Sequence, residues 1–327
     1  WDKKRIVEYQ NEQLQFLVRH CFENVPYYRN IFNEYGISAE QIKDTRDLKK
    51  IPIIDKDTVM KNRNNLIADN YDKRMLRSAY TSGTTSTPLQ IYISKQALEY
   101  ETAFYRRMWS WHGYNGEKCL VMRGGMNCHN RMYSYNPLTN LITINTRNLD
   151  EKLMNYVIDI IRKFKPCFMQ AYPSIAWVFA RHVLNSGMTR AARCFKAVFC
   201  ASERLFDFQR QEIETAFGCK VVDSYGHNEK LVLMQKCEYN ELYHVIPEYG
   251  ITEILDDNGM DVIRGGSTGE IIGTGFINLA FPLLRYRTDG TGIAKNAPMR
   301  QYETPIANQE GNKCLQEFLE MLPFALL

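Results

Sequence analysis

The chain has 327 residues, enough for about two domains, although one large α/β unit is also compatible with this length. Lysine and arginine total 41 against 37 acidic residues, and no basic run or basic-aromatic repeat occurs, so nucleic-acid binding is unsupported. No apolar run approaches the roughly 20 residues of a membrane span, and no signal-peptide pattern opens the chain. The nine cysteines are odd in number and scattered, which indicates free thiols in a reducing cytoplasm.

The first 78 residues predict helices. Apolar residues recur at helical spacing from Lys3 to about Glu23, and Val25-Pro26 then interrupts the pattern. A shorter helical pattern leads to Leu48, and Asp55 or Asp57 is placed to cap a further helix. We expect residues 1–78 to form a helical lead-in packed on the main domain.

Residues 79–224 alternate between short apolar strands and helices. Strands are expected at 89–93, 119–122, 141–144, 167–171, 197–200 and 221–224. Helices are expected after Ser94 and at about 150–164, 174–185 and 206–217. This alternation with short links predicts a mainly parallel sheet covered on both faces.

Beyond Tyr225 the strand pattern continues without intervening helices. Strands are expected at 242–246, 250–255, 269–274 and 283–287. They predict an antiparallel sheet or small barrel over residues 225–292, and residues 293–327 are expected to be an irregular C-terminal segment.

The segment Thr81-Ser82-Gly83-Thr84-Thr85-Ser86-Thr87-Pro88 gathers six hydroxyls around one glycine. Backbone N–H groups opened by the glycine, together with these hydroxyls, can surround phosphate oxygens. It is not a Walker A loop, because the second glycine and the lysine are missing. The alternative is a Ser/Thr-rich turn, since these residues favour turns through local hydrogen bonds.

Two later loops carry complementary chemistry. Residues 223–229 offer an aromatic ring, a glycine, an amide and a carboxylate, whereas residues 285–290 offer a fork of cations and an aspartate. In open α/β sheets such loops converge at the carboxyl ends of the strands. Together the three loops could stack a base, bind phosphate, hold a metal and fix a ribose, as an ATP site requires.

In these loops the chain resembles the adenylate-forming superfamily of acyl-CoA synthetases, peptide-synthetase adenylation domains and luciferases. Within it, the chain is most similar to the phenylacetate-CoA ligase-like branch, which includes capsular-polysaccharide biosynthesis proteins. The family motifs TSGTTGKP or TSGTTGTP, YGxTE and RYRTGD match residues 81–88, Tyr225-Gly226-His227-Asn228-Glu229 and Arg285-Tyr286-Arg287-Thr288-Asp289-Gly290, in that order. The resemblance covers roughly residues 10–292. It implies a large α/β domain in which 79–224 bind the nucleotide and 225–292 complete the ATP site.

The resemblance implies an ATP-dependent acid–thiol ligase. A carboxylic acid would become an acyl-adenylate with release of pyrophosphate, and the acyl group would then pass to CoA or another acceptor, in capsular-polysaccharide or aryl/acyl acid metabolism. The alternative is a homologue that binds nucleotide or acts as a scaffold in a polysaccharide pathway without catalysis. The oligomeric state stays open, and a dimer is compatible with the sequence.

The resemblance also implies roles for single residues. The phosphate loop would hold ATP through Thr81, Ser82, Gly83, Thr84 and Thr85. Tyr225 would lie against adenine, Asp289 would accept the ribose hydroxyls, and Glu229 would hold Mg²⁺. Asn228 stands where the family has a Thr or Ser that donates to the α-phosphate. Catalysis would rest on Thr84, Asn228 and Glu229.

Further contacts are expected around this set. Additional nucleotide contacts would come from Ser202, Glu203, Ser224 and Gly226. Tyr172 and His227 would face the acid substrate. A helix start capped by Ser174 explains residues 172–174 equally well, and His227 can instead be a surface or packing histidine.

Two departures from the family and one metal hypothesis complete the picture. The order Asp289-Gly290 reverses the family's Gly-Asp, which turns the carboxylate to the opposite face of an extended segment unless a bulge compensates. The small C-terminal domain of the family is not identifiable, so we expect it to be absent or truncated. Cys237 and His244 resemble part of a Zn²⁺ site of relatives, but fewer than four ligands are evident; the alternative for Cys237 is a buried apolar role.

Overall fold

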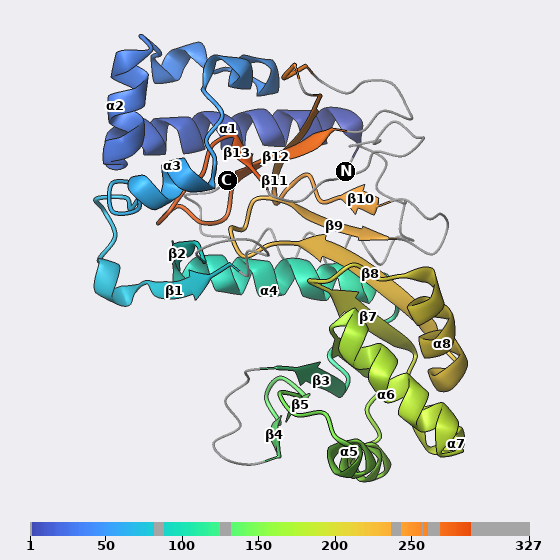
Figure 1. The fold of residues 1–327 in the computed structure, drawn as a ribbon. Coiled ribbons are helices and arrows are strands. Elements are labelled where there is room, and N and C mark those ends of the chain that lie inside the picture. The colour runs from blue at the N-terminus through green and yellow to red at the C-terminus, as the bar shows by residue number, and fades with distance from the viewer. Residues whose placement is uncertain are drawn as a thin grey trace. The chain divides into compact units, whose positions relative to one another are not determined.

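The computed structural model describes residues 2–81, 88–124, 132–236, 243–256, 258–260 and 269–288 (Figure 1). These residues fall into two compact units. The first unit comprises the described residues up to Tyr105, Gly226–Met234 and those from Tyr243 onward, and the second comprises Arg106–Tyr225 with Gln235 and Lys236. Within the described ranges, no helix combines the length and the apolar character that crossing a membrane requires.

The first unit begins with the expected helices. They are α1 (Lys3–Asn24), α2 (Pro26–Glu34) and α3 (Lys56–Lys61), with the 3-10 turns η1 (Ala39–Gln41), η2 (Thr45–Lys50) and η3 (Lys73–Met75). Val25 is extended and Pro26 opens α2, where its missing N–H costs nothing. Of the two candidate caps for α3, the structure selects Asp55, whose carboxylate accepts from the Thr58 N–H at 2.8 Å.

Two small antiparallel sheets belong to the first unit. β1 (Arg77–Tyr80) pairs with β2 (Gln90–Ile93), and β11 (Gly250–Leu255), β12 (Glu270–Gly275) and β13 (Tyr286–Arg287) form a three-stranded sheet. The three-stranded sheet confirms the antiparallel pattern predicted from residue 250 onward, but the strand expected at 242–246 is not part of it. Ser94 caps α4 (Lys95–Ser110), as expected, by accepting from the Ala97 N–H at 3.1 Å. β10 (Tyr243–Val245) lies beside β9 (Leu233–Lys236), where the Ile246 N–H donates to the Leu233 carbonyl at 2.9 Å.

The second unit contains the predicted parallel sheet. Six neighbouring strands run in the order β8 (Lys220–Gly226, of which Gly226 belongs to the first unit), β7 (Ala197–Ala201), β6 (Phe168–Ala171), β3 (Cys119–Arg123), β5 (Leu141–Asn145) and β4 (Tyr133–Asn136). All adjacent pairs are parallel except β4 with β5. The carboxyl ends of β3, β6, β7 and β8 therefore share one edge.

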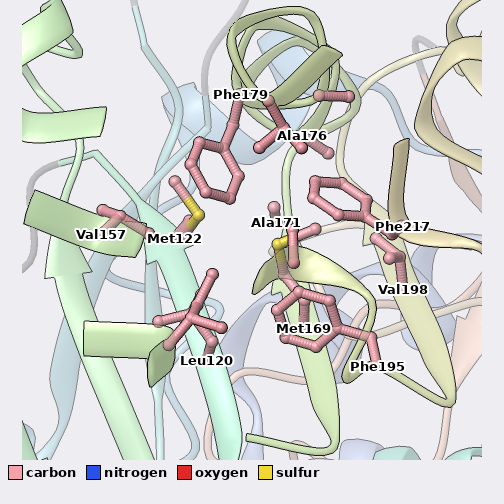
Figure 2. Packing of buried hydrophobic residues seen from close by; sticks show 14 of the residues in the cluster. Leu120, Met122, Val157, Met169, Ala171, Ala176, Phe179, Phe195, Val198 and Phe217 are labelled. Atoms are coloured by element: carbon pink, nitrogen blue, oxygen red, sulfur yellow. The ribbon is translucent and has the colours of Figure 1, made fainter. Parts of the chain in front are cut away.

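Apolar side chains cover both faces of this sheet. On one face lie the helices α5 (Glu151–Phe164), α6 (Pro173–Asn185), α7 (Thr189–Ala192) and α8 (Asp207–Phe217). Figure 2 shows the packing beneath them, which includes Leu120, Met122, Met169, Val198, Phe179 and Phe217. Alternate strand residues point the other way: Phe199 stacks on Trp109 with ring centroids 4.7 Å apart, and Phe168 meets Tyr114 edge-on at 5.2 Å. The expectation of a sheet covered on both faces is confirmed.

Candidate functional site

The turn that follows β8 in the first unit carries three of the expected site residues. The Lys230 N–H donates to the His227 carbonyl at 3.3 Å, which reverses the chain directly after Glu229. Lys230 itself has a left-handed backbone, with φ of 62°, a conformation that residues other than glycine seldom adopt. Its ammonium lies 2.7 Å from a carboxylate oxygen of Glu101 on α4, and the two side chains are 8% and 19% exposed.

Glycines in β11 and β12 let the backbone of this turn approach the three-stranded sheet closely. A Cβ atom on Gly275 would lie 2.4 Å from the Lys230 carbonyl oxygen, and one on Gly250 would lie 2.4 Å from the Leu231 carbonyl oxygen. No larger residue fits at either position without moving backbone. The turn is thus seated on β11 and β12 through backbone contacts.

His227 and Glu229 lie side by side in this turn. The imidazole Nδ1 is 3.5 Å from a carboxylate oxygen of Glu229, and the side chains are 16% and 11% exposed. Burial, and to a smaller extent the charge of Lys230, lower the pKa of His227 to about 4, so the imidazole is neutral at pH 7. The contact is therefore not an ion pair. The substrate-facing role of His227 stays a prediction.

Asn228 joins this turn to the predicted phosphate loop. Its side-chain amide donates to the Tyr80 carbonyl at 2.9 Å, and Tyr80 is the last residue of β1. The next residue, Thr81, donates its N–H to the Leu89 carbonyl at 2.9 Å, so the two ends of the loop are held together. Of the five loop residues expected to hold ATP, only Thr81 is described; Ser82, Gly83, Thr84 and Thr85 lie outside the described residues.

The two arginines of the third loop, which form the fork of cations seen in the sequence, are both paired with glutamates. Arg285, which also has a positive φ of 49°, makes two hydrogen bonds to the Glu253 carboxylate, of 3.0 and 2.9 Å, and a third of 2.9 Å to the Ile51 carbonyl. Arg287 lies 2.9 Å from Glu270. The buried Arg285 fork therefore holds the first unit together. Asp289 and Gly290 lie outside the described residues.

The second unit has polar residues at the carboxyl edge of its own sheet. The Arg123 guanidinium lies 5.7 Å from the centre of the Tyr172 ring, at the ends of β3 and β6. At the end of β7, Ser202 has a φ of 73°, and the Glu203 carboxylate accepts from the Ser174 N–H at 3.1 Å. Glu203 thereby satisfies a free N–H at the start of α6.

The structure corrects the alternative in which Ser174 caps the start of α6. Ser174 does not cap α6: Tyr172 occupies the N-cap position without a side-chain bond, and Ser174 is the second residue of the helix. Its N–H is satisfied by Glu203, which follows a different strand and could not be recognised as a cap from local sequence. The nucleotide contact expected of Glu203 and the substrate contact expected of Tyr172 stay predictions.

The end of β8 is anchored within the second unit. The Ser224 hydroxyl donates to Gln235 at 3.2 Å, and the Gln235 amide donates to the Met108 carbonyl at 3.1 Å. Gln235 is fully buried and Ser224 is nearly so. Ser224 thus has a packing role within the second unit. The nucleotide contacts expected of Ser202, Ser224, Tyr225 and Gly226 stay predictions.

The described residues give no support to a Zn²⁺ site but are compatible with bound Mg²⁺. Across the part of the chain that the structure describes, no group of three or more His, Cys, Asp or Glu side chains could hold a metal ion. His244 lies in β10 and Cys237 lies outside the described residues, so Zn²⁺ gains no support. The donor set does fit Mg²⁺, which is commonly bound by one or two carboxylates together with substrate phosphates. Glu229, in the turn that Asn228 ties to the end of β1, is the carboxylate that would hold Mg²⁺, and this role stays a prediction.

Sequence reasoning missed the pair of Lys230 and Glu101. Lys230 stands directly after a motif residue, which was a usable signal, and its partner Glu101 lies 129 positions away. Glu101 falls at helical spacing among the buried Ala97, Phe104 and Met108, so its place on the apolar face of α4 was a second usable signal. The other glutamate of α4, Glu99, is exposed.

Comparisons with known proteins agree on the family and the fold. The family model of AMP-binding enzymes matches residues 37–277. Protein CapK of Staphylococcus aureus is 24% identical over 308 residues, covering 92% of this chain and 66% of CapK. A phenylacetate-coenzyme A ligase of Aromatoleum evansii is 26% identical over 297 residues, covering 85% of this chain and 64% of the ligase. The chain thus spans just under two thirds of the length of these relatives.

Solved structures show the same fold. A 2-hydroxyisobutyryl-CoA ligase in complex with 2-HIB-AMP and CoA, in an open conformation, superposes with a TM-score of 0.66 at 17% identity, covering 84% of this chain and 66% of the ligase. The same ligase in its postadenylation state gives a TM-score of 0.68 at 19% identity, with 87% and 61% covered. At this identity the likeness establishes the architecture alone.

Proposed function

We propose that this chain, which belongs to the family of AMP-binding enzymes, is the nucleotide-binding part of an ATP-dependent acid–CoA ligase. The observation that carries the proposal is the hydrogen bond from Asn228 to Tyr80, because it joins the turn that bears Glu229 to the start of the hydroxyl-rich loop within one unit. Relatives with the names CapK and phenylacetate-coenzyme A ligase support the choice of chemistry.

The proposed reaction has two steps. A substrate carboxylate oxygen attacks the α-phosphorus of ATP, a new P–O bond forms, and the bond to pyrophosphate breaks. The CoA thiol then releases its proton to solvent and its sulfur bonds to the acyl carbon, while AMP leaves with the electrons of the acyl–oxygen bond. Positioned donors and cations stabilise the charge on phosphate oxygens, and no side-chain nucleophile is needed.

The residues of the turn have distinct tasks in this proposal. Glu229 would hold Mg²⁺, which when bound neutralises charge on the phosphates. Asn228 has two amide hydrogens; one bonds to Tyr80, and the other can donate to an α-phosphate oxygen. Tyr225 would lie against adenine and Asp289 would accept from the ribose. Because ATP and CoA are intracellular reactants, we place the reaction in the cytoplasm.

A substrate panel tests the proposal. The full natural chain would be incubated with Mg²⁺, ATP and a set of aryl, alkyl and hydroxy acids, with and without CoA, and pyrophosphate release would be measured. We expect release that depends on one class of acid, and an acyl-CoA product when CoA is present. ATP binding without release for any acid would instead favour the non-catalytic homologue.

A further inference from the structure

We infer that Lys230 and Glu101 are a positioning pair: they set the affinity of the site for MgATP by fixing the turn that carries Glu229, without touching the nucleotide themselves. The inference rests on the proposed function and deepens it. It begins from the place of Lys230, which is the residue directly after the proposed Mg²⁺ ligand and is buried.

The ion pair determines where the turn ends. The Lys230 ammonium lies 2.7 Å from Glu101, and the lysine side chain is only 8% exposed, so the charge faces the protein interior. A lysine in this pairing is not available as a phosphate ligand. It instead fastens a left-handed turn, with φ of 62°, to α4.

Glu101 is itself oriented by a buried neighbour. Tyr249, which is 1% exposed, makes a side-chain hydrogen bond to Glu101 and packs edge-on against Phe104 with ring centroids 5.3 Å apart. The backbone of Lys230 and Leu231 lies against the glycines of β11 and β12. The carboxylate that receives Lys230 thus has a fixed place.

The turn has a second anchor at its other end, where Asn228 bonds to Tyr80. Glu229 lies between the two anchors. If Lys230 loses its partner, a buried charge is left uncompensated and the left-handed residue is free to relax. The turn that carries Glu229 then keeps one of these two anchors. Loss of such an outer partner typically costs about 10- to 100-fold in metal affinity or activity.

The test compares Lys230→Met, Glu101→Gln and the double variant with the wild-type chain. Binding of MgATP and its dependence on Mg²⁺ concentration would be measured by calorimetry, and pyrophosphate release would be measured separately to split kcat from KM. We expect each single variant to bind MgATP about 10- to 100-fold more weakly. The double variant should be no worse than the worse single variant, because both remove one interaction.

The control is Lys196→Met, which removes the exposed pair of Lys196 and Glu117, 3.1 Å apart before β7 and β3. It should leave MgATP binding unchanged. If Lys230→Met does not fold, Glu101→Gln still tests the pair, because it keeps the shape of the side chain and an acceptor oxygen. Variants that unfold at lower urea concentration but bind MgATP like the wild type, or single effects that simply multiply, would overturn the inference.

Different results would refute the proposed ligase reaction and the proposed positioning pair. A wild-type chain that binds MgATP but releases no pyrophosphate would refute the ligase reaction and leave the positioning pair to be judged by binding. Wild-type catalysis with unaffected variants would refute the pair alone. Absence of MgATP binding by the wild-type chain would overturn both.

Discussion

The side-chain amide of Asn228 donates a hydrogen bond of 2.9 Å to the backbone carbonyl of Tyr80, 148 positions earlier in the chain. Tyr80 is the residue before the hydroxyl-rich loop, and Asn228 is the residue before Glu229. The bond therefore brings two of the three motifs together within one unit. Four predictions follow from this bond and from the ion pairs and buried groups around it.

Asn228→Ala should lower kcat/KM for ATP by about two- to tenfold, since the net value of one hydrogen bond is about 0.5–1.5 kcal/mol. Stability should change little, because Asn228 is exposed. Initial rates of pyrophosphate release against ATP concentration measure the effect. Asn155→Ala, which removes a 2.9 Å bond to His182 in the second unit, is the matched control. Equal rates for wild type and Asn228→Ala would refute the linking role.

Glu229→Gln should reduce pyrophosphate release by more than about 100-fold, because it removes the carboxylate that we propose holds Mg²⁺, and bound metal contributes several kcal/mol of transition-state stabilisation. The substitution keeps the size of the side chain. Glu212→Gln, at a glutamate that accepts from the Trp177 indole at 3.0 Å, makes the same chemical change elsewhere and should leave the rate intact. Unchanged turnover in Glu229→Gln would reject its assignment as the metal ligand.

Arg285→Met should lower the free energy of unfolding by about 3–5 kcal/mol, because it leaves the buried Glu253 carboxylate without its cation. Arg287→Met removes a pair with Glu270 in which both side chains are about half exposed, so it should cost only about 0–1 kcal/mol. Urea unfolding of the two variants provides the comparison. Similar losses in both would contradict the structural role of Arg285.

His20 should make the chain less stable in mild acid. Its ring lies 2.8 Å from the Leu279 carbonyl oxygen, and burial is the main cause that lowers its pKa below 6.5. The unfolded chain therefore takes up a proton near pH 6.5, whereas the folded chain does so only at lower pH. Stability should be full above pH 6.5 and should fall as the pH decreases from there toward the folded pKa.

His20→Gln keeps a donor for Leu279 and removes this titration. The urea midpoint of the variant should decline less steeply than that of the wild type between pH 7 and 5. The decline should shrink without vanishing, because the pKa of His227 is lowered too. If the urea midpoints of both proteins fall equally steeply with pH, the titration of His20 does not cause the decline.

Local patterns account for most of the elements. Apolar spacing located the helices α1, α4, α5 and α8, and it located the parallel strands, whose side chains are buried on both faces of the sheet. β1 was missed because its residues are mostly exposed and show no apolar alternation. β4 was missed for a similar reason: it is an edge strand in which tyrosines alternate with serine and asparagine at half-buried and exposed positions.

The sequence by itself determined the family and the order of the site loops, because motif residues and their spacing are properties of the chain alone. Only the tertiary structure decided which charged side chains are free for a ligand. Arg285, one of the cations of the third loop, is held by Glu253, and Lys230, which follows Glu229, is held by Glu101. Whether a charge is available depends on which distant carboxylate reaches it, and no local periodicity encodes that contact.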